Sequence, residues 1–216
     1  ADVATVQRQF NVVLARTVME LNGSACLPLE AAPPPRQQII ASRSFGIPVT
    51  AFAMLSEAVA SHTARAAAKL RLAGLEAGLL QVFIGTNPFT PEAPQYHPGA
   101  TVPLAIPTAD TPRLLRAARA GLRQIYTPGY EYKRAGVVLL DLAPVGAVTG
   151  DLFARTTPAG TEGRERLMAV MDGVNTRWGR GTLRYLAEGF VQPWQMRRAR
   201  MTPRYTTCWE ELPGAG

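Results

Sequence analysis

Side chains that could support metal-dependent phosphoryl transfer are present in this 216-residue chain, but they are scattered. Such chemistry needs several carboxylates that converge on a pair of metal ions. The acidic side chains between residues 36 and 146 each fall on a different predicted element: Glu57, Glu76, Glu92, Asp110, Glu131 and Asp141. Asp141 lies within an apolar strand pattern, yet no second carboxylate accompanies it. We therefore predict that this chain alone is not an enzyme.

The cysteines, histidines and glycines form no recognisable site either. Cys26 and Cys208 lie far apart in sequence and far from both histidines, which argues against a zinc site and a disulfide framework. The sequence contains no phosphate-binding loop of the GxxxxGK[ST] or GxGxxG type. His62 lies on the apolar side of a predicted helix, where a packed, hydrogen-bonded histidine is expected, and His97 lies in a proline-rich loop. No metal or cofactor is predicted in this chain.

The charge balance favours a polyanionic partner without identifying one. The chain has 23 Lys+Arg against 16 Asp+Glu, a net charge of +7. Only Lys69 and Lys133 are lysines, and an arginine-rich composition also arises from GC-rich coding. With few cysteines, no apolar run of about 18 residues and no signal-peptide pattern, the chain is expected to be soluble and cytoplasmic.

The elements that would position a site begin with a helical pattern. Apolar residues recur every three or four positions from Val3 to Leu21, and Asn22-Gly23 ends the pattern. Because the chain lacks an initiator methionine and starts within this pattern, it is expected to be a piece of a longer protein. Residues 31–35 end in Pro33-Pro34-Pro35 and are predicted to form a stiff linker.

Residues 36–146 contain six predicted elements in the order strand, helix, strand, strand, helix, strand. The strands are predicted at 36–45, 79–84, 101–106 and 136–142. The helices are predicted at 50–73 and from Thr111-Pro112 to Pro128-Gly129, with Thr111 as the cap and Pro112 as the first helical residue. This order is the split βαβ pattern of an α+β fold, a four-stranded sheet with two helices on one face. The other face is left open, and we expect a partner to dock there.

Hydroxyl and basic side chains gather near two strand ends. Ser42, Arg43 and Ser44 lie towards the end of the first strand, where a guanidinium fork and hydroxyls suit phosphate oxygens. Lys133-Arg134 opens the last strand, although charges there can also serve only to blunt a sheet end.

Two further features bear on nucleic-acid binding. Arg113, Arg116 and Arg123 share one side of the second helix, for which a solvated surface is the alternative interpretation. Phe83 is the only aromatic residue on the two central strands, so base stacking of the kind seen in RNA-recognition modules is not favoured.

The sequence changes character after Pro144. Residues 147–160 are mostly small or polar apart from Leu152-Phe153, which is typical of a tether that carries one apolar pair. Residues 162–172 have a helical pattern, and residues 177–204 contain seven arginines against a single acid, Glu188.

Several of these stretches resemble the Y-family translesion DNA polymerases, in particular their UmuC group. They are FNVVLARTVMELNGSA at 10–25, IIASRSFG at 39–46, IPT at 106–108, YKRAGV at 132–137, LMAVMDGVN at 167–175, PWQMR at 193–197 and PRYTT at 203–207. The last two are typical of the UmuC group rather than of Y-family polymerases at large. The resemblance covers essentially the whole chain.

The resemblance implies a domain organisation. It comprises the end of a thumb at 1–30, the linker at 31–35, a DNA-holding little finger at 36–146, a tether at 147–160 and a UmuC-type C-terminal segment at 161–216. The palm and fingers, with the metal-binding carboxylates, would lie outside this chain. The parent enzyme would use Mg²⁺ and deoxynucleotides bound there, which agrees with the absence of a carboxylate cluster here.

The resemblance also implies a largely sequence-neutral grip on primer–template DNA during error-prone translesion synthesis and DNA repair. The residues expected to contact DNA are Arg36, Ser42, Arg43, Ser44, Lys133 and Arg134.

Protein partners follow from the same resemblance. In this family a sliding-clamp peptide of the form Gln-Leu-x-Leu-Phe usually follows the little finger, and the matching stretch here is TGDLF at 149–153. Leu152 and Phe153 match, whereas Thr149 and Gly150 depart from the pattern; the alternative is that Leu152-Phe153 packs onto its own domain. The arginines expected to serve the processed UmuD dimer and the RecA filament are Arg177, Arg180, Arg184, Arg197 and Arg198.

A different class of function stays open. A ferredoxin-like regulatory or protein-interaction module, with a basic surface set by genome composition, would show a concave apolar pocket or a protein partner and no salt-sensitive DNA binding. Only the polymerase interpretation accounts for the resemblance at both ends of the chain.

Overall fold

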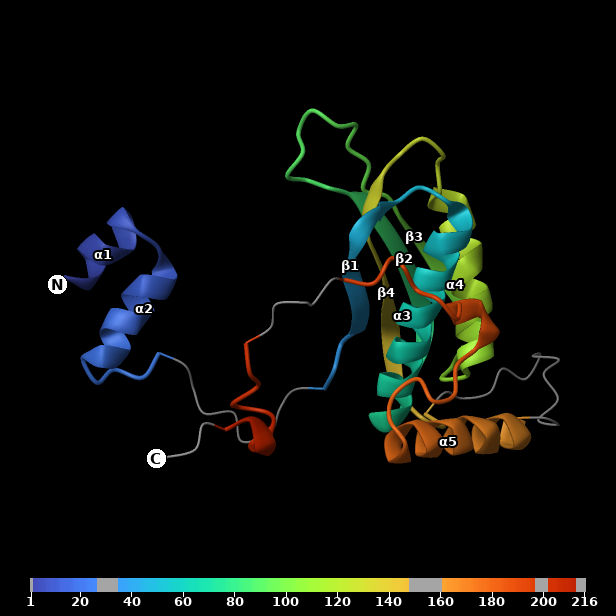
Figure 1. Cartoon of the computed structure of the whole chain (residues 1–216). Helices are drawn as coiled ribbons and strands as arrows, with labels where there is room; N and C mark the ends of the chain where they lie inside the picture. Colours follow the sequence, from blue (N-terminus) through green and yellow to red (C-terminus); the bar gives the residue numbers. More distant parts are fainter. Residues whose placement is uncertain (1, 27–34, 148–160, 197–201, 213–216) are drawn as a thin grey trace. The chain divides into compact units, whose positions relative to one another are not determined.

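The computed structural model describes residues 2–26, 35–147, 161–196 and 202–212 (Figure 1). The chain divides into two compact units, Ala1–Pro35 and Arg36–Gly216. In the described part, no helix is long and apolar enough to cross a membrane.

The first unit contains two helices where the apolar pattern predicted one. Helix α1 spans Val3–Gln9 and helix α2 spans Val12–Leu21. The interruption lies at Asn11, whose side-chain oxygen accepts a hydrogen bond from the Leu14 amide at 2.9 Å and so caps α2. Asparagine is a favoured N-cap because it satisfies an otherwise unpaired helix amide, and this local bond overrides the continuous apolar stripe.

The second unit contains the predicted α+β fold. Four strands, β1 (Ile39–Val49), β2 (Leu75–Thr86), β3 (Gly99–Thr108) and β4 (Tyr132–Pro144), form an antiparallel sheet in the order β1-β4-β2-β3. Helices α3 (Phe52–Leu72) and α4 (Thr111–Ile125) follow β1 and β3. The predicted βαββαβ order and the α+β class are confirmed.

Strands β2, β3 and β4 extend at both ends beyond their predicted bounds, whereas β1 begins at Ile39 and not at residue 36. β2 and β4 pair with each other along almost their whole lengths, so backbone pairing continues past the apolar segments. β1 was predicted to stop at Gly46 but continues to Val49, and the Gly46 amide donates to the Trp194 carbonyl at 3.0 Å. Pro48 is tolerated there because β1 is an edge strand.

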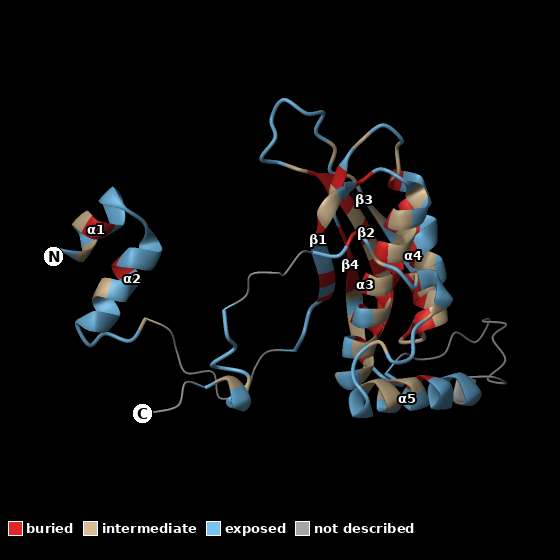
Figure 2. Cartoon of the chain, viewed as in Figure 1, coloured by how far each residue is buried: buried red, intermediate tan, exposed pale blue. Residues whose placement is uncertain are grey.

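The hydrophobic core lies between the sheet and the two helices, as the buried residues in Figure 2 show. Leu55 and Leu70 of α3 and Leu114 and Leu122 of α4 are completely buried. On the sheet, alternate residues such as Leu80 face this core. The opposite face of the sheet, which we call the open face, carries no helix of the βαββαβ unit.

The beginning of α4 differs from the predicted cap. Thr111 was expected to cap a helix that starts at Pro112, but Asp110 is the N-cap residue and Thr111 is already helical. The Thr111 hydroxyl is instead a partner of Arg71, whose Nη1 donates to it at 2.8 Å. Thr111 is buried, so its hydroxyl satisfies a tertiary contact rather than a helix end.

The C-terminal segment packs against the βαββαβ unit. Helix α5 (Thr161–Arg177) is held by Asp172, which accepts two hydrogen bonds from Arg71 at 2.6 and 2.8 Å. A second ion pair joins Arg164 to Asp110 at 3.0 Å. A forked guanidinium–carboxylate pair fixes orientation as well as distance, so α5 has a defined position on this unit.

Two short 3-10 helices, η1 (Leu186–Glu188) and η2 (Trp209–Glu211), follow α5. Between them Trp194 joins the hydrophobic core of the sheet domain and is only 4% exposed. Its ring meets the edges of Phe45 and His62, with 6.1 Å between ring centroids in each case. Trp194 therefore anchors the C-terminal segment to β1 and α3.

Candidate nucleic-acid interface

The open face brings together part of the predicted DNA-contacting set. Because side chains alternate along a strand, Ser42 and Ser44 share the face opposite to the buried Ala41. In the neighbouring strand β4, Gly136 lies opposite Ser42 and Arg134 lies opposite Ser44. Two exposed hydroxyls and one exposed guanidinium thus line one end of this face.

The position of Arg134 depends on a glycine in β2. Gly85 pairs with Arg134, and a Cβ atom at Gly85 would lie 2.9 Å from Arg134 Nε and 2.7 Å from His97 Nδ1. The Arg134 and His97 side chains therefore both cover Gly85. Any larger residue would have to displace these two side chains, so glycine lets the guanidinium and the imidazole lie together on the open face.

The centre of the open face is apolar. A Cβ atom at Gly136 would collide with the Phe83 ring, 2.5 Å from its Cζ atom, so the ring occupies the space above this glycine. Ile40 is exposed on the same face, whereas Val138 is largely covered. The Phe83 ring is partly buried and packs across the sheet, so it leaves little exposed ring surface for a base to stack on.

The other predicted DNA contacts lie elsewhere. Arg43 shares the side of β1 that carries Ala41 and Phe45, opposite to its two serine neighbours, and lies in a pocket beside α3. Lys133 is half-buried at a β-bulge, where two residues of β4 lie against one of β2. Arg36 is exposed and precedes the start of β1, whereas Ser44 lies five residues into that strand.

The arginines of α4 differ in their partners. Arg113 pairs with Asp110 at 3.7 Å, and Arg116 donates to the Pro112 carbonyl at 3.4 Å. Arg123 is exposed. This helix covers the core side of the sheet, so its arginines do not lie on the open face.

The residues predicted to bind protein partners are described only in part. Leu152 and Phe153, and Arg197 and Arg198, lie outside the described residues. The remaining arginines are all exposed: Arg177, Arg180 and Arg184. Arg177 lies over the Trp178 ring at 4.8 Å, Arg184 donates to the Gly181 carbonyl at 2.9 Å, and Arg180 lines the same pocket as Arg43.

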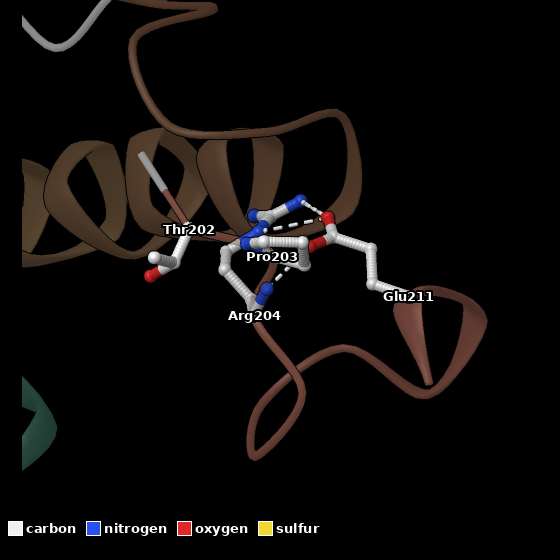
Figure 3. A pocket seen from close by; sticks show the side chains of 4 residues that line it. All are labelled: Thr202, Pro203, Arg204 and Glu211. Atoms are coloured by element: carbon white, nitrogen blue, oxygen red, sulfur yellow. Dashed lines mark hydrogen bonds and ion pairs between the residues drawn. The ribbon is translucent and has the colours of Figure 1, made fainter. Parts of the chain in front are cut away.

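A second hollow, in the last described stretch, is closed by its own charges. Thr202, Pro203, Arg204 and Glu211 line it (Figure 3). Glu211 accepts hydrogen bonds from Arg204 Nη2 at 2.6 Å and from Arg204 Nε at 3.0 Å. Because the carboxylate takes up this guanidinium, the hollow offers no unpaired charge to a ligand.

Carboxylates do not gather around a metal position in the described part of the chain, where no three His, Cys, Asp or Glu residues form a possible ligand group. Asp141, the acid that the sequence placed in a strand, is exposed in β4 and folds over Gly78.

His62 is packed as predicted, but it is not hydrogen-bonded. The residue is 1% exposed, and neither ring nitrogen has a hydrogen-bond partner among the described residues. Burial of the ring, together with the charges of Arg65 and Arg43, lowers the pKa of His62 from 6.5 to about 4. The imidazole is therefore neutral at physiological pH.

This pKa predicts a loss of stability in acid. Because the folded-state pKa lies below the unfolded value, the unfolded chain binds the extra proton, so the stabilisation is complete above pH 6.5 and is lost as the pH falls towards about 4. The expected loss is on the order of 3 kcal/mol. Urea unfolding in chloride buffers between about pH 7 and 4.5 should show this loss of stability in the wild-type protein. The His62→Gln variant should lose much less stability over the same pH range.

Two comparisons isolate the His62 effect. The pKa of Glu188 is raised by burial, so its contribution is lost as the pH rises, opposite to that of His62. The exposed His97, replaced by glutamine, should leave the wild-type pH dependence intact. The same acid sensitivity in wild type and His62→Gln would contradict the assignment.

Two stretches of the sequence match known protein families. Residues 36–152 match the impB/mucB/samB family C-terminal domain, and residues 165–215 match a domain of unknown function, DUF4113. Because the first match spans more than half of the sequence, the chain belongs to the impB/mucB/samB family.

Curated relatives agree with this family. The chain is 42% identical to protein SamB of Salmonella typhimurium, an alignment that covers 100% of this chain and 50% of SamB. It is 40% identical to protein UmuC of the same species over 96% of this chain and 49% of UmuC. The resemblance to the UmuC group is thereby confirmed, and the chain spans about half the length of these relatives.

A solved structure, the Y-family DNA polymerase chimera Dbh-Dpo4(243-245)-Dbh, is 11% identical to the chain and gives a TM-score of 0.37 over 66% of this chain and 39% of the chimera. That similarity is too remote to carry a structural argument.

Proposed function

We propose that this chain is the DNA-holding and partner-binding C-terminal portion of an error-prone Y-family DNA polymerase that acts in translesion synthesis and DNA repair. Membership of the family that includes UmuC supports the polymerase assignment. The observation that carries the DNA-holding role is the open face, where Ser42, Ser44 and Arg134 are exposed side by side. The chain would not be catalytic by itself, and Mg²⁺ and deoxynucleotides would be bound outside it.

The chemistry of the open face suits a phosphate backbone better than base edges. Arg134 can donate a fork of two hydrogen bonds to a phosphate, and each serine hydroxyl can donate one. The cross-strand rows that hold Ser42 with Gly136 and Phe83, and Ser44 with Arg134 and Gly85, contain no acidic residue. Contacts of this kind are independent of sequence, which a polymerase that copies damaged templates requires.

The sliding clamp, the processed UmuD dimer and the RecA filament are proposed as protein partners. Leu152 and Phe153 would serve the clamp, and the arginines of the C-terminal segment would serve the other two. A clamp pull-down that is unchanged by Leu152→Ala with Phe153→Ala would contradict the first assignment, and UmuD binding that survives deletion of residues 160–216 would contradict the second.

Salt dependence of DNA binding tests the proposed function. Fluorescence anisotropy of the chain with a labelled primer–template should give a log affinity that falls linearly with log salt, with a slope that corresponds to roughly three to six phosphate contacts. The same slope on duplexes of unrelated sequence is expected. Binding that is absent at low salt, or insensitive to salt, would contradict a phosphate grip.

A further inference from the structure

A polar pocket with a volume of about 300 Å³ lies where β1, α3 and the C-terminal segment meet. Its lining residues come from all three parts: Arg43, Ser44, Ser61, His62, Arg65, Arg180, Gln192, Trp194, Gln195 and Met196. We propose that this pocket, here called the Arg43–Trp194 pocket, binds a phosphate group. The proposal goes beyond the proposed function because Arg43 and His62 lie on the helix side of β1. Ser44, which alternates onto the open face, borders the pocket because β1 is an edge strand.

Two almost completely buried side chains in the pocket lack the hydrogen bonds that their polar atoms need. His62 is 1% exposed and Trp194 is 4% exposed. Both ring nitrogens of His62 and Nε1 of Trp194 have no partner among the described residues. An indole N–H can only donate, and a neutral imidazole donates from one nitrogen. Buried donors without partners are costly, so these groups indicate a ligand that offers acceptor oxygens.

The charge around the pocket indicates that this ligand is an anion. Arg43, Arg65 and Arg180 supply three guanidinium groups, and within the described residues no ion pair involves Arg43 or Arg180. The carboxylates nearby are Glu188, which interacts with Arg184 and Arg65 and accepts the Tyr185 amide at 3.0 Å, and Glu57, whose carboxylate lies beside Gly189. Among the described residues neither carboxylate forms an ion pair with Arg43 or Arg180, so these two guanidinium groups keep their positive charge for a ligand.

The lining residues match phosphate better than other ligands. A metal cation is disfavoured by the arginines, and an apolar ligand would leave the charges of Arg43 and Arg180 unpaired. Guanidinium forks bind phosphate oxygens in pairs, and serine hydroxyls and side-chain amides add single donors. A phosphate offers enough oxygens to accept from several arginines and from the orphaned ring donors together. The group could belong to a free phosphate or to a nucleic-acid backbone.

His62 reports directly on occupancy of the pocket. The chain has only two histidines, so His97→Gln leaves one imidazole signal for NMR. Titration of inorganic phosphate into this variant should raise the pKa of His62 by about one unit or more, because a nearby anion favours the imidazolium form. Sodium chloride at matched ionic strength is the control and should shift it far less.

Arg180→Ala tests the contribution of the C-terminal segment. Arg180 is exposed, so its replacement should leave the melting temperature unchanged while the affinity for phosphate falls about 10-fold or more. Arg180→Lys keeps the positive charge but loses the forked pair of donors, so its affinity for phosphate should lie between those of wild type and Arg180→Ala. Arg177→Ala is the matched control, because Arg177 lies over Trp178 and does not line the pocket. Equal effects of Arg180→Ala and Arg177→Ala would overturn the proposal.

Primer–template DNA distinguishes the two sources of phosphate. If the DNA backbone supplies the group, duplex DNA alone raises the pKa of His62, and Arg180→Ala also weakens DNA binding. If the ligand is a free phosphate, only inorganic phosphate raises the pKa of His62. A rise with DNA and a rise with phosphate alone would each support the site. An unchanged His62 with phosphate and with DNA would overturn it. Arg134→Glu should leave the phosphate titration intact, so failure of the DNA-holding role and failure of the pocket are distinguishable.

Discussion

Replacing Arg134 with glutamate is expected to weaken binding of primer–template DNA by roughly 10- to 100-fold at low salt. Arg134 lies opposite Ser44 on the open face and covers Gly85, so its guanidinium is held where a phosphate would approach. The range corresponds to the loss of a charge-assisted hydrogen bond, about 1.5–3 kcal/mol. Anisotropy titrations at several salt concentrations should also show a salt slope that is reduced by about one.

The matched control for this prediction is Arg123→Glu. It changes the net charge of the chain by the same amount, but Arg123 is exposed on α4, which covers the other side of the sheet. We expect Arg123→Glu to weaken binding less than about 3-fold, through long-range charge alone. Equal losses in the two variants would mean that DNA binding follows net charge and not the open face.

Replacing Trp194 with alanine is expected to lower the free energy of unfolding by about 3–5 kcal/mol. Trp194 belongs to the core of the sheet domain, and its carbonyl accepts the Gly46 amide at 3.0 Å. Loss of the ring removes edge contacts with Phe45 and His62 and leaves a cavity between β1 and α3. Urea unfolding monitored by circular dichroism would measure the loss.

The chain offers a control of the same residue type. Trp209 is 87% exposed, so Trp209→Ala should change the unfolding free energy by less than about 0.5 kcal/mol. Limited proteolysis of Trp194→Ala should also cleave the C-terminal segment faster than in the Trp209→Ala variant. If both variants unfold at the same urea concentration as wild type, Trp194 does not anchor this segment.

Much of the fold could be predicted because each element of residues 36–146 has its own apolar pattern. Short apolar runs indicated the strands, and apolar residues at every third or fourth position indicated the helices. Read along the chain, these patterns predicted the βαββαβ order. The missed features depend on single side chains. Asn11 ends a helix that the apolar stripe would have continued, and Thr111 faces Arg71, 40 residues away in sequence, instead of capping α4. Hydrogen bonds of single side chains leave no trace in the spacing of apolar residues, so the sequence pattern could not predict them.

The candidate site could be predicted less well. Arg43 was grouped with Ser42 and Ser44 by proximity in sequence, yet it shares its side of the strand with Ala41 and Phe45. Strand alternation alone was enough to separate them. The pocket beside Arg43 could not be foreseen, because Trp194 and Arg180 reach it from more than a hundred residues away.

The central claim is that the open face of the sheet holds DNA. Methyl NMR of the chain, recorded with and without primer–template, tests it most directly. Ile40 is exposed on that face, and Leu72 is 91% exposed at the end of α3. We predict that the Ile40 methyl signals shift on DNA binding and that those of Leu72 stay in place. Shifts at Leu72 with none at Ile40 would contradict the account.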